Sequence, residues 1–134
     1  MLVRAKKDHK DYGDILRLRK DNLYIIFAVG SRKGFDEYLA LNAQYKIEDY
    51  SEPDPLFFPA DVFELIEDRV SPTWETKDVK IGDEIVTYTS FPEWFQDDFY
   101  IAAHDWNLEN TQYDIVKHYL KKYQELYSDK IVYS

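Results

Sequence analysis

The sequence contains no cysteine, only four glycines and three histidines, and no long apolar run. The lack of cysteine excludes a disulfide framework, thiolate catalysis and cysteine-ligated zinc. The four glycines are too scattered to form a phosphate-binding loop or a dinucleotide-binding fingerprint. The longest apolar run, Leu23 to Val29, is much shorter than the about 20 residues that a membrane-spanning helix needs.

Catalytic motifs are also missing. The histidines, at positions 9, 104 and 118, form no H-E-x-x-H motif, and no serine lies in a G-x-S-x-G context. The sequence therefore assigns no catalytic residue, no metal ligand and no cofactor. Because the first ten residues have basic side chains but no apolar stretch after them, we expect no signal peptide and a cytoplasmic protein that contacts no membrane.

The composition favours one folded domain that spans residues 1–134. Of the 134 residues, 45% are hydrophobic and 17% are aromatic, well above the composition of disordered chains. A chain of this length buries about two thirds of its unfolded surface. We therefore expect a single globular domain with a substantial core, and the sequence leaves its oligomeric state open.

The charge is divided unevenly along the chain. Residues 1–33 carry nine Lys/Arg against four Asp/Glu, whereas residues 34–116 carry four against twenty, together with most of the aromatic residues. With a net charge of −9, the chain should repel nucleic acid. An acidic surface with aromatic residues is suited to a cationic protein partner. The basic residues near the amino end, among them Lys6, Lys10, Arg17 and Arg19, are either a small patch or, as we favour, solvated strand faces and turns.

Alternation and turn signals predict an antiparallel meander in the first third of the chain. Residues 15–19 alternate apolar and basic side chains, and Lys20-Asp21-Asn22 supplies a turn. Residues 23–29 have the composition of a central strand covered on both faces, so we expect a hairpin over residues 15–29. After a second turn at residues 30–34, residues 35–42 fit a third strand better than the alternative, a short helix.

The middle of the chain predicts a loop followed by a helix. Residues 48–59 contain three prolines, which exclude regular structure there. Pro59 and Asp61 suit the first turn of a helix that we expect to reach Arg69. Its buried stripe would consist of four apolar residues, Val62, Phe63, Leu65 and Ile66.

The last third predicts a hairpin and two helices. The hairpin is expected at residues 74–89, around Gly82-Asp83. Ser90 and Glu93 have the spacing of a capping box that opens a short helix. From residue 110 onward one arc at helical spacing carries Tyr113, Val116, Tyr119, Leu120, Tyr123 and Tyr127. The predicted fold is α+β: an antiparallel sheet of about four to five strands with helices packed on it and a long C-terminal amphipathic helix.

Two stretches carry the candidate functional residues. The acidic, aromatic loop at residues 48–58 cannot bury all of its rings within its own short span, and residues 93–106 combine carboxylates with tryptophans. We interpret both as parts of one partner-binding surface. Its residues are Glu48, Asp49, Tyr50, Glu52, Asp54, Phe57, Trp94, Asp97, Asp98, Asp105 and Trp106.

Two other interpretations stay open. A small hydrolase or a metal-binding domain could use Glu93, Asp97, Asp98, His104 and Asp105. Aromatic walls raise carboxyl pKa values, and Mg²⁺ or Ca²⁺ accepts carboxylate oxygens as ligands. Alternatively, the acidity only keeps an accessory protein soluble.

In size, acidity, aromatic density and lack of catalytic motifs, the chain resembles the small acidic immunity proteins that bacteria make against polymorphic or contact-dependent toxins. The resemblance is one of composition and matches no motif, so it assigns no residue. It implies a non-enzymatic cytoplasmic inhibitor that occupies the cationic active-site cleft of a toxin such as a nuclease, with carboxylates in place of substrate phosphates. The expected partner is thus a basic protein such as a toxin domain.

Overall fold

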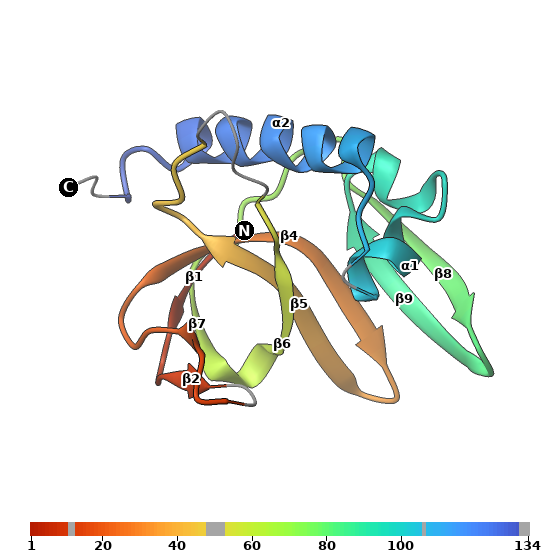
Figure 1. Ribbon diagram of the computed structural model, residues 1–134, viewed down its shortest axis with the longest axis horizontal. Helices are drawn as coiled ribbons and strands as arrows, with labels where there is room; N and C mark the ends of the chain where they lie inside the picture. Colours follow the sequence, from red (N-terminus) through yellow and green to blue (C-terminus); the bar gives the residue numbers. More distant parts are fainter. Residues whose placement is uncertain (11–12, 48–52, 106, 132–134) are drawn as a thin grey trace.

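The computed structural model describes residues 1–10, 13–47, 53–105 and 107–131. Within these ranges the chain forms a curled antiparallel sheet, a separate two-stranded sheet, and one short and one long α-helix (Figure 1). The α+β class and the long C-terminal helix are confirmed, but the main sheet has seven strands rather than four to five. No helix in these ranges is long and apolar enough to cross a membrane.

The main sheet closes on itself at one end. Its strands are β1 (Leu2–Ala5), β4 (Leu23–Arg32), β5 (Phe35–Asn42), β6 (Leu56–Pro59), β7 (Phe63–Glu67), β8 (Glu75–Ile81) and β9 (Glu84–Ser90). Five of them follow the order β6-β5-β4-β1-β7, and β9 pairs with both β4 and β8. β6 and β7 lie at opposite edges of the five, yet only the 3-10 helix η1 (Ala60–Val62) separates them in sequence. The five strands therefore curl until these edges approach, as Figure 1 shows.

β4 is the strand shared by both parts of the sheet. It pairs with β5 along one edge, while on the other edge its first half pairs with β1 and its second half with β9. The register with β5 shifts between Ile26 and Ala28, which leaves Phe27 as an extra residue that bends the strand where its partner changes. Residues 25–28 are all 0% exposed, which confirms a central strand covered on both faces.

Two apolar clusters fill these two faces. The inner cluster lies within the curl and contains Val3, Tyr24, Ile26, Phe58 and Phe63. The small sheet of β2 (His9–Lys10) and β3 (Leu16–Leu18) adds Leu18 to it. The outer cluster lies under the long helix α2 (Asn110–Leu126), which buries Val116, Tyr119, Leu120 and Tyr123. These four belong to the helical arc predicted from the sequence; of its other two members, Tyr127 is buried just beyond α2 and Tyr113 is half-buried.

Three expectations about local structure are wrong. β3 pairs with β2 and not with β4, so residues 15–29 form no hairpin. The expected helix up to Arg69 is η1 followed by β7, because β1 has a second edge on which Phe63 and Leu65 pair with Ala5 and Val3. Residues 48–59 are not irregular throughout, since Leu56–Pro59 forms β6. Its proline is tolerated because β6 is an edge strand.

Predictions from short-range signals agree better with the structure. Residues 35–42 form β5, and the hairpin around Gly82-Asp83 is β8–β9. A short helix follows as the 3-10 helix η2 (Pro92–Phe95), but the predicted capping box is wrong. The Ser90 hydroxyl donates to the Phe27 carbonyl at 2.6 Å instead of capping a helix.

Candidate protein-binding surface

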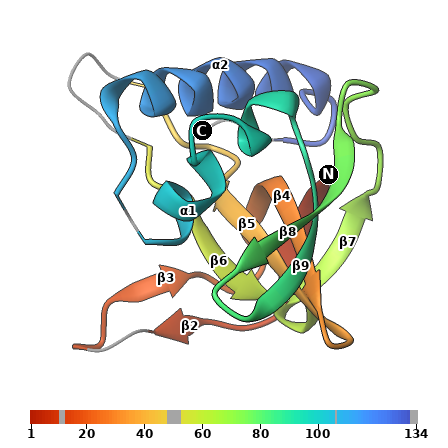
Figure 2. The same cartoon turned by 90° about the vertical axis from the view of Figure 1, so that its right-hand side faces the viewer.

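The short helix α1 (Phe99–His104) is held by an aromatic cluster beneath it. Phe99 is 1% exposed, and its ring centroid lies 5.5 Å from that of Phe91 and 5.6 Å from that of Trp94. Phe91 in turn stacks on Tyr119 at 4.4 Å, so α1 lies beside the N-terminal half of α2 (Figure 2). Because Phe99 and Ala103 are buried, the residues on the other side of this helix face outward.

The outward face of α1 combines carboxylates with one aliphatic side chain. Asp98, Ile101 and Asp105 follow the i, i+3, i+7 spacing of a single helix face. Both aspartates are exposed, and Ile101 is 40% exposed. His104 Nδ1 lies 3.8 Å from the Asp105 carboxylate at the end of the helix. This face therefore offers an apolar contact flanked by negative charge.

The turn before α1 brings a further aspartate to the same surface. Asp97 and Asp98 both adopt left-handed backbone conformations, with φ of 52° and 56°. Aspartate and asparagine enter this region more readily than other non-glycine residues. The Gln112 side-chain amide donates to the Asp97 carbonyl at 3.4 Å, which ties this turn to the first turn of α2.

The N-terminal half of α2 extends the surface. Glu109 is the N-cap residue, and it forms a capping box with Gln112. A groove of about 250 Å³ is lined by Glu93, Asp114, Ile115, His118 and Tyr119. The Tyr119 hydroxyl donates to the Glu93 carboxylate at 2.6 and 3.0 Å, and burial together with this contact raises the pKa of Tyr119. Tyr119 therefore stays a neutral donor and fixes the carboxylate of Glu93 at the groove.

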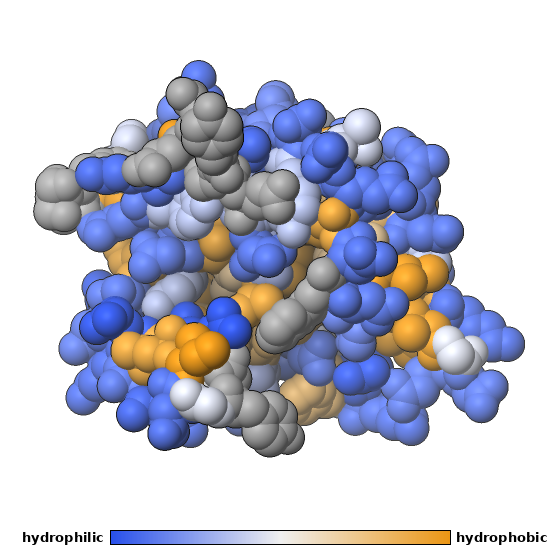
Figure 3. All heavy atoms as spheres, in the orientation of Figure 1, coloured by the Kyte–Doolittle hydropathy of each residue, from blue (hydrophilic) through white to orange (hydrophobic). Residues whose placement is uncertain are grey.

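We call six carboxylates the α1–α2 acidic surface: Glu93, Asp97, Asp98, Asp105, Glu109 and Asp114. Asp54 lies at its margin, where it accepts a hydrogen bond from the Tyr113 hydroxyl at 3.0 Å. Within the described ranges, none of these seven carboxylates is in an ion pair with lysine or arginine. Hydrophilic side chains dominate the surface over α2, and apolar residues reach the surface in separate patches (Figure 3).

Carboxylates at the far end of β4, in contrast, are neutralised within the chain. Arg32 lies 3.0 Å from Glu84 and 3.3 Å from Glu37, and Lys33 lies 3.4 Å from Glu84. The hydrogen bond from Lys33 and the charges of both cations lower the pKa of Glu84. The basic N-terminal block therefore meets the acidic segment here, through Arg32 and Lys33.

Two of the aromatic residues expected at the surface, Phe57 and Trp94, are described by the structure, and both pack in the core. Trp94 is 0% exposed, which corrects its assignment to the partner-binding residues. Phe57 is half-buried, and its ring lies 6.1 Å from that of Trp94 and 5.8 Å from that of His104. The space between the curled sheet and α2 is wide enough to take these large side chains. The other expected residues, Glu48, Asp49, Tyr50, Glu52 and Trp106, lie outside the described part of the chain.

The geometry does not favour an active or metal-binding site in residues 93–105. The Glu93 carboxylate accepts the Tyr119 hydroxyl, and among the described carboxylates only that of Asp105 makes an ion-pair contact with His104. Over the residues that the structure describes, no group of three or more His, Asp or Glu side chains is placed to hold a metal ion. The carboxylates are spread over a surface and do not converge on one point.

The sequence did not assign Ile101, Glu109 and Asp114 to this surface, and it named Glu93 only for the hydrolase or metal-binding alternative. The spacing of Asp98, Ile101 and Asp105 is a usable signal once a helix is placed over residues 99–104. Asp114 lies on the exposed side of α2. Its proximity to Glu93 comes from the packing of η2 against α2.

Models of known protein families, curated proteins and solved structures give no match to this chain. The fold and the surface define an α+β domain with a set of largely exposed carboxylates that form no ion pair with a described lysine or arginine. The resemblance to small acidic immunity proteins remains a prediction from composition.

Proposed function

We propose that this chain is a non-enzymatic protein-binding domain whose α1–α2 acidic surface receives a basic protein, and that it acts as an immunity protein against a toxin. The observation that carries the proposal is the group of carboxylates on α1 and α2 that no lysine or arginine of the described chain neutralises. Such a surface gains from a cationic partner, whereas Glu37 and Glu84 already have one within the chain.

Charge and apolar contact have different roles in the proposed binding of a basic partner. A net charge of −9 attracts a basic domain over long range and speeds its encounter, an effect that salt weakens. At contact, Ile101 supplies apolar area, and Asp98 and Asp105 on either side of it accept hydrogen bonds from lysine or arginine. Carboxylates in these positions can replace the phosphates that a nuclease-like toxin binds in its cleft.

The first experiment identifies the partner by affinity purification from the native host and then measures its binding with purified proteins. The test variant replaces Asp97, Asp98 and Asp105 with asparagine. Asparagine keeps the size of each side chain and suits the left-handed backbone at residues 97 and 98, so the fold should be retained. The matched control replaces three other exposed aspartates, Asp36, Asp61 and Asp83, with asparagine.

Both variants lose three negative charges, so they separate local contact from overall attraction. We expect the test variant to bind a basic partner about tenfold more weakly or worse, and the control to change by about threefold at most. Association of the unmodified chain should slow as salt rises, and co-expression of the chain should abolish toxicity of the partner. Equal effects of both variants, or a partner without toxicity, contradict the immunity role. Failure to purify any partner favours an accessory protein.

A further inference from the structure

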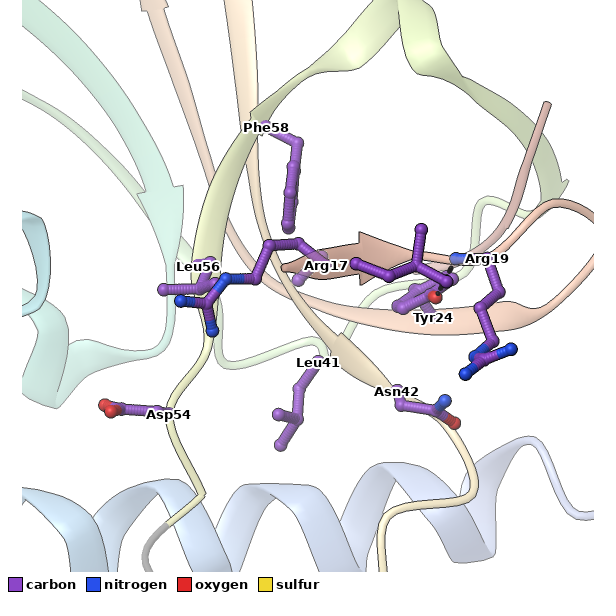
Figure 4. Close-up of a pocket in the computed structure, with 10 residues that line it drawn as sticks. Arg17, Arg19, Tyr24, Leu41, Asn42, Asp54, Leu56 and Phe58 are labelled. Atoms are coloured by element: carbon purple, nitrogen blue, oxygen red, sulfur yellow. Dashed lines mark hydrogen bonds between the residues drawn. The ribbon is translucent and has the colours of Figure 1, made fainter. Parts of the chain in front are cut away.

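A groove of about 260 Å³ opens at one mouth of the curled sheet, between β3 and the neighbouring ends of β5 and β6. Its apolar part is formed mainly by Leu41, Leu56 and Phe58. Figure 4 shows the Arg17 side chain reaching toward Leu56 and the Arg19 side chain on the side of Asn42. Mouths of curled sheets are frequent ligand sites, with a few polar groups placed over an apolar floor.

Two uncharged side chains, those of Tyr24 and Asn42, offer hydrogen-bond donors to the groove. The oxygen of each already accepts a hydrogen bond from the chain. The Tyr24 hydroxyl oxygen accepts the Arg19 backbone N–H at 2.9 Å, and no described residue accepts the proton of this hydroxyl. Tyr24 is 4% exposed, and its burial raises its pKa, so it keeps that proton. Asn42 Oδ1 accepts the Gln44 backbone N–H at 2.8 Å, which leaves the Asn42 amide nitrogen as the donor to the groove.

The charged side chains at the groove also favour a ligand that accepts hydrogen bonds and carries negative charge. Arg17 and Arg19 are two residues apart at β3 and both line the groove. Asp54 is the one acidic residue among the lining residues that the structure describes, and its carboxylate accepts the Tyr113 hydroxyl. In Figure 4 the Asp54 carboxylate is directed away from Leu41 and Arg19. The Arg19 guanidinium lies in the groove together with the donors of Tyr24 and Asn42, so donors gather here on a chain of net charge −9.

We propose that the groove binds a small organic anion, either a carboxylate or a phosphate, whose apolar body lies on Leu41, Leu56 and Phe58. The Arg19 guanidinium, the Tyr24 hydroxyl and the Asn42 amide donate to the anionic oxygens. Arginine suits this role because its planar fork binds carboxylate and phosphate with two parallel hydrogen bonds. The proposal does not depend on the α1–α2 acidic surface, so either can fail without the other.

The ligand class is tested by NMR titration of the ¹⁵N-labelled chain with phenyl phosphate, benzoate, benzyl alcohol and inorganic phosphate. We expect saturable shifts of the Arg19 Nε–H and Asn42 side-chain signals with phenyl phosphate or benzoate, and the tighter of the two identifies the head group. Benzyl alcohol lacks the charge and should give no saturation. Inorganic phosphate lacks the apolar body and should bind at least about tenfold more weakly.

Variants decide whether the groove itself binds the anion. Arg19→Gln should weaken binding about tenfold, and Tyr24→Phe should weaken it several-fold, since each removes a donor to the anion. Lys20→Gln is the matched control, because it removes one positive charge from an adjacent exposed residue that does not line the groove. It should change affinity less than twofold. Equal weakening by Lys20→Gln and Arg19→Gln, or no saturable shift with either aromatic anion, would overturn the proposal.

Discussion

Replacing Ser90 with alanine should destabilise the protein through its sheet and not through the helix that follows. The Ser90 hydroxyl donates to the Phe27 carbonyl at 2.6 Å, and both residues are 0% exposed. Phe27 is the extra residue of β4, at the bend where pairing passes from β1 to β9. The hydroxyl therefore holds the end of β9 against β4 at the bulge of β4.

The loss of stability expected for Ser90→Ala follows from the burial of this hydrogen bond. A neutral hydrogen bond contributes about 0.5–1.5 kcal/mol, and a buried carbonyl that loses its donor costs about 1–3 kcal/mol. We expect Ser90→Ala to lower the free energy of unfolding by about 1–2 kcal/mol, which for a domain of this size lowers Tm by about 3–10 °C. Ser31→Ala is the control, because Ser31 lies on β4, the strand of Phe27, and its hydroxyl has no hydrogen bond to a described residue. Its effect should stay within about 0.5 kcal/mol.

A double-mutant cycle in urea, followed by circular dichroism, separates the two interpretations of Ser90. In a capping box, Ser90 and Glu93 would act together, so the costs of Ser90→Ala and Glu93→Ala would not add. In the structure Ser90 bonds to Phe27 and Glu93 to Tyr119, so the two share no partner. Their costs should add within about 0.5 kcal/mol. A coupling of about 1 kcal/mol or more, or an unaffected Ser90→Ala variant, would refute this reasoning.

Two further predictions concern the outer core. Gly30→Ala should lower the free energy of unfolding, measured in urea, by about 1–3 kcal/mol. The new Cβ would lie 2.8 Å from the ring of Tyr88, which itself packs on Trp94 at a centroid distance of 5.2 Å. An unchanged urea midpoint would show that the Tyr88 ring can move aside. Raising the pH above about 10 should also destabilise the protein, because burial raises the pKa of Tyr88 and Tyr127 to about 12 and also raises that of Tyr119 and Tyr123. The unfolded chain loses these protons while the folded chain keeps them, so urea midpoints should be constant near pH 9 and fall between about pH 10 and 12; midpoints that stay constant up to pH 12 would contradict it.

Helices and hairpins could be predicted where the pattern that specifies them lies within their own residues. The stripe from Val116 to Tyr123 predicts α2, because a helical period of 3.6 needs no knowledge of the rest of the chain. Gly82, with φ of 60°, marks the β8–β9 hairpin for the same reason. Strand β7 could not be predicted in this way, since Phe63, Leu65 and Ile66 fit a helical stripe as well as a strand. The open edge of β1, which is distant in sequence, decided between them.

The candidate site, too, could be predicted from the sequence only in part. The number of carboxylates predicts an acidic surface, but it does not tell which carboxylates remain unpaired. The register of β4 with β5 and β9 brings Arg32 to Glu37 and Glu84, which removes those acids from any partner surface. Trp94 illustrates the converse, because a ring assigned to the surface lies in the space between the sheet and α2.

By itself, the sequence determined the α+β class, the buried central strand, the second hairpin and the long amphipathic helix. Each of these depends on residues that are neighbours along the chain or recur with a fixed period. Only the tertiary structure decided that the sheet curls until the edges β6 and β7 approach, that α1 presents Asp98, Ile101 and Asp105 outward, and that Arg17 and Arg19 line a groove with further donors. These features arise from pairings between distant segments, and a local pattern carries no record of which distant segment will be its partner.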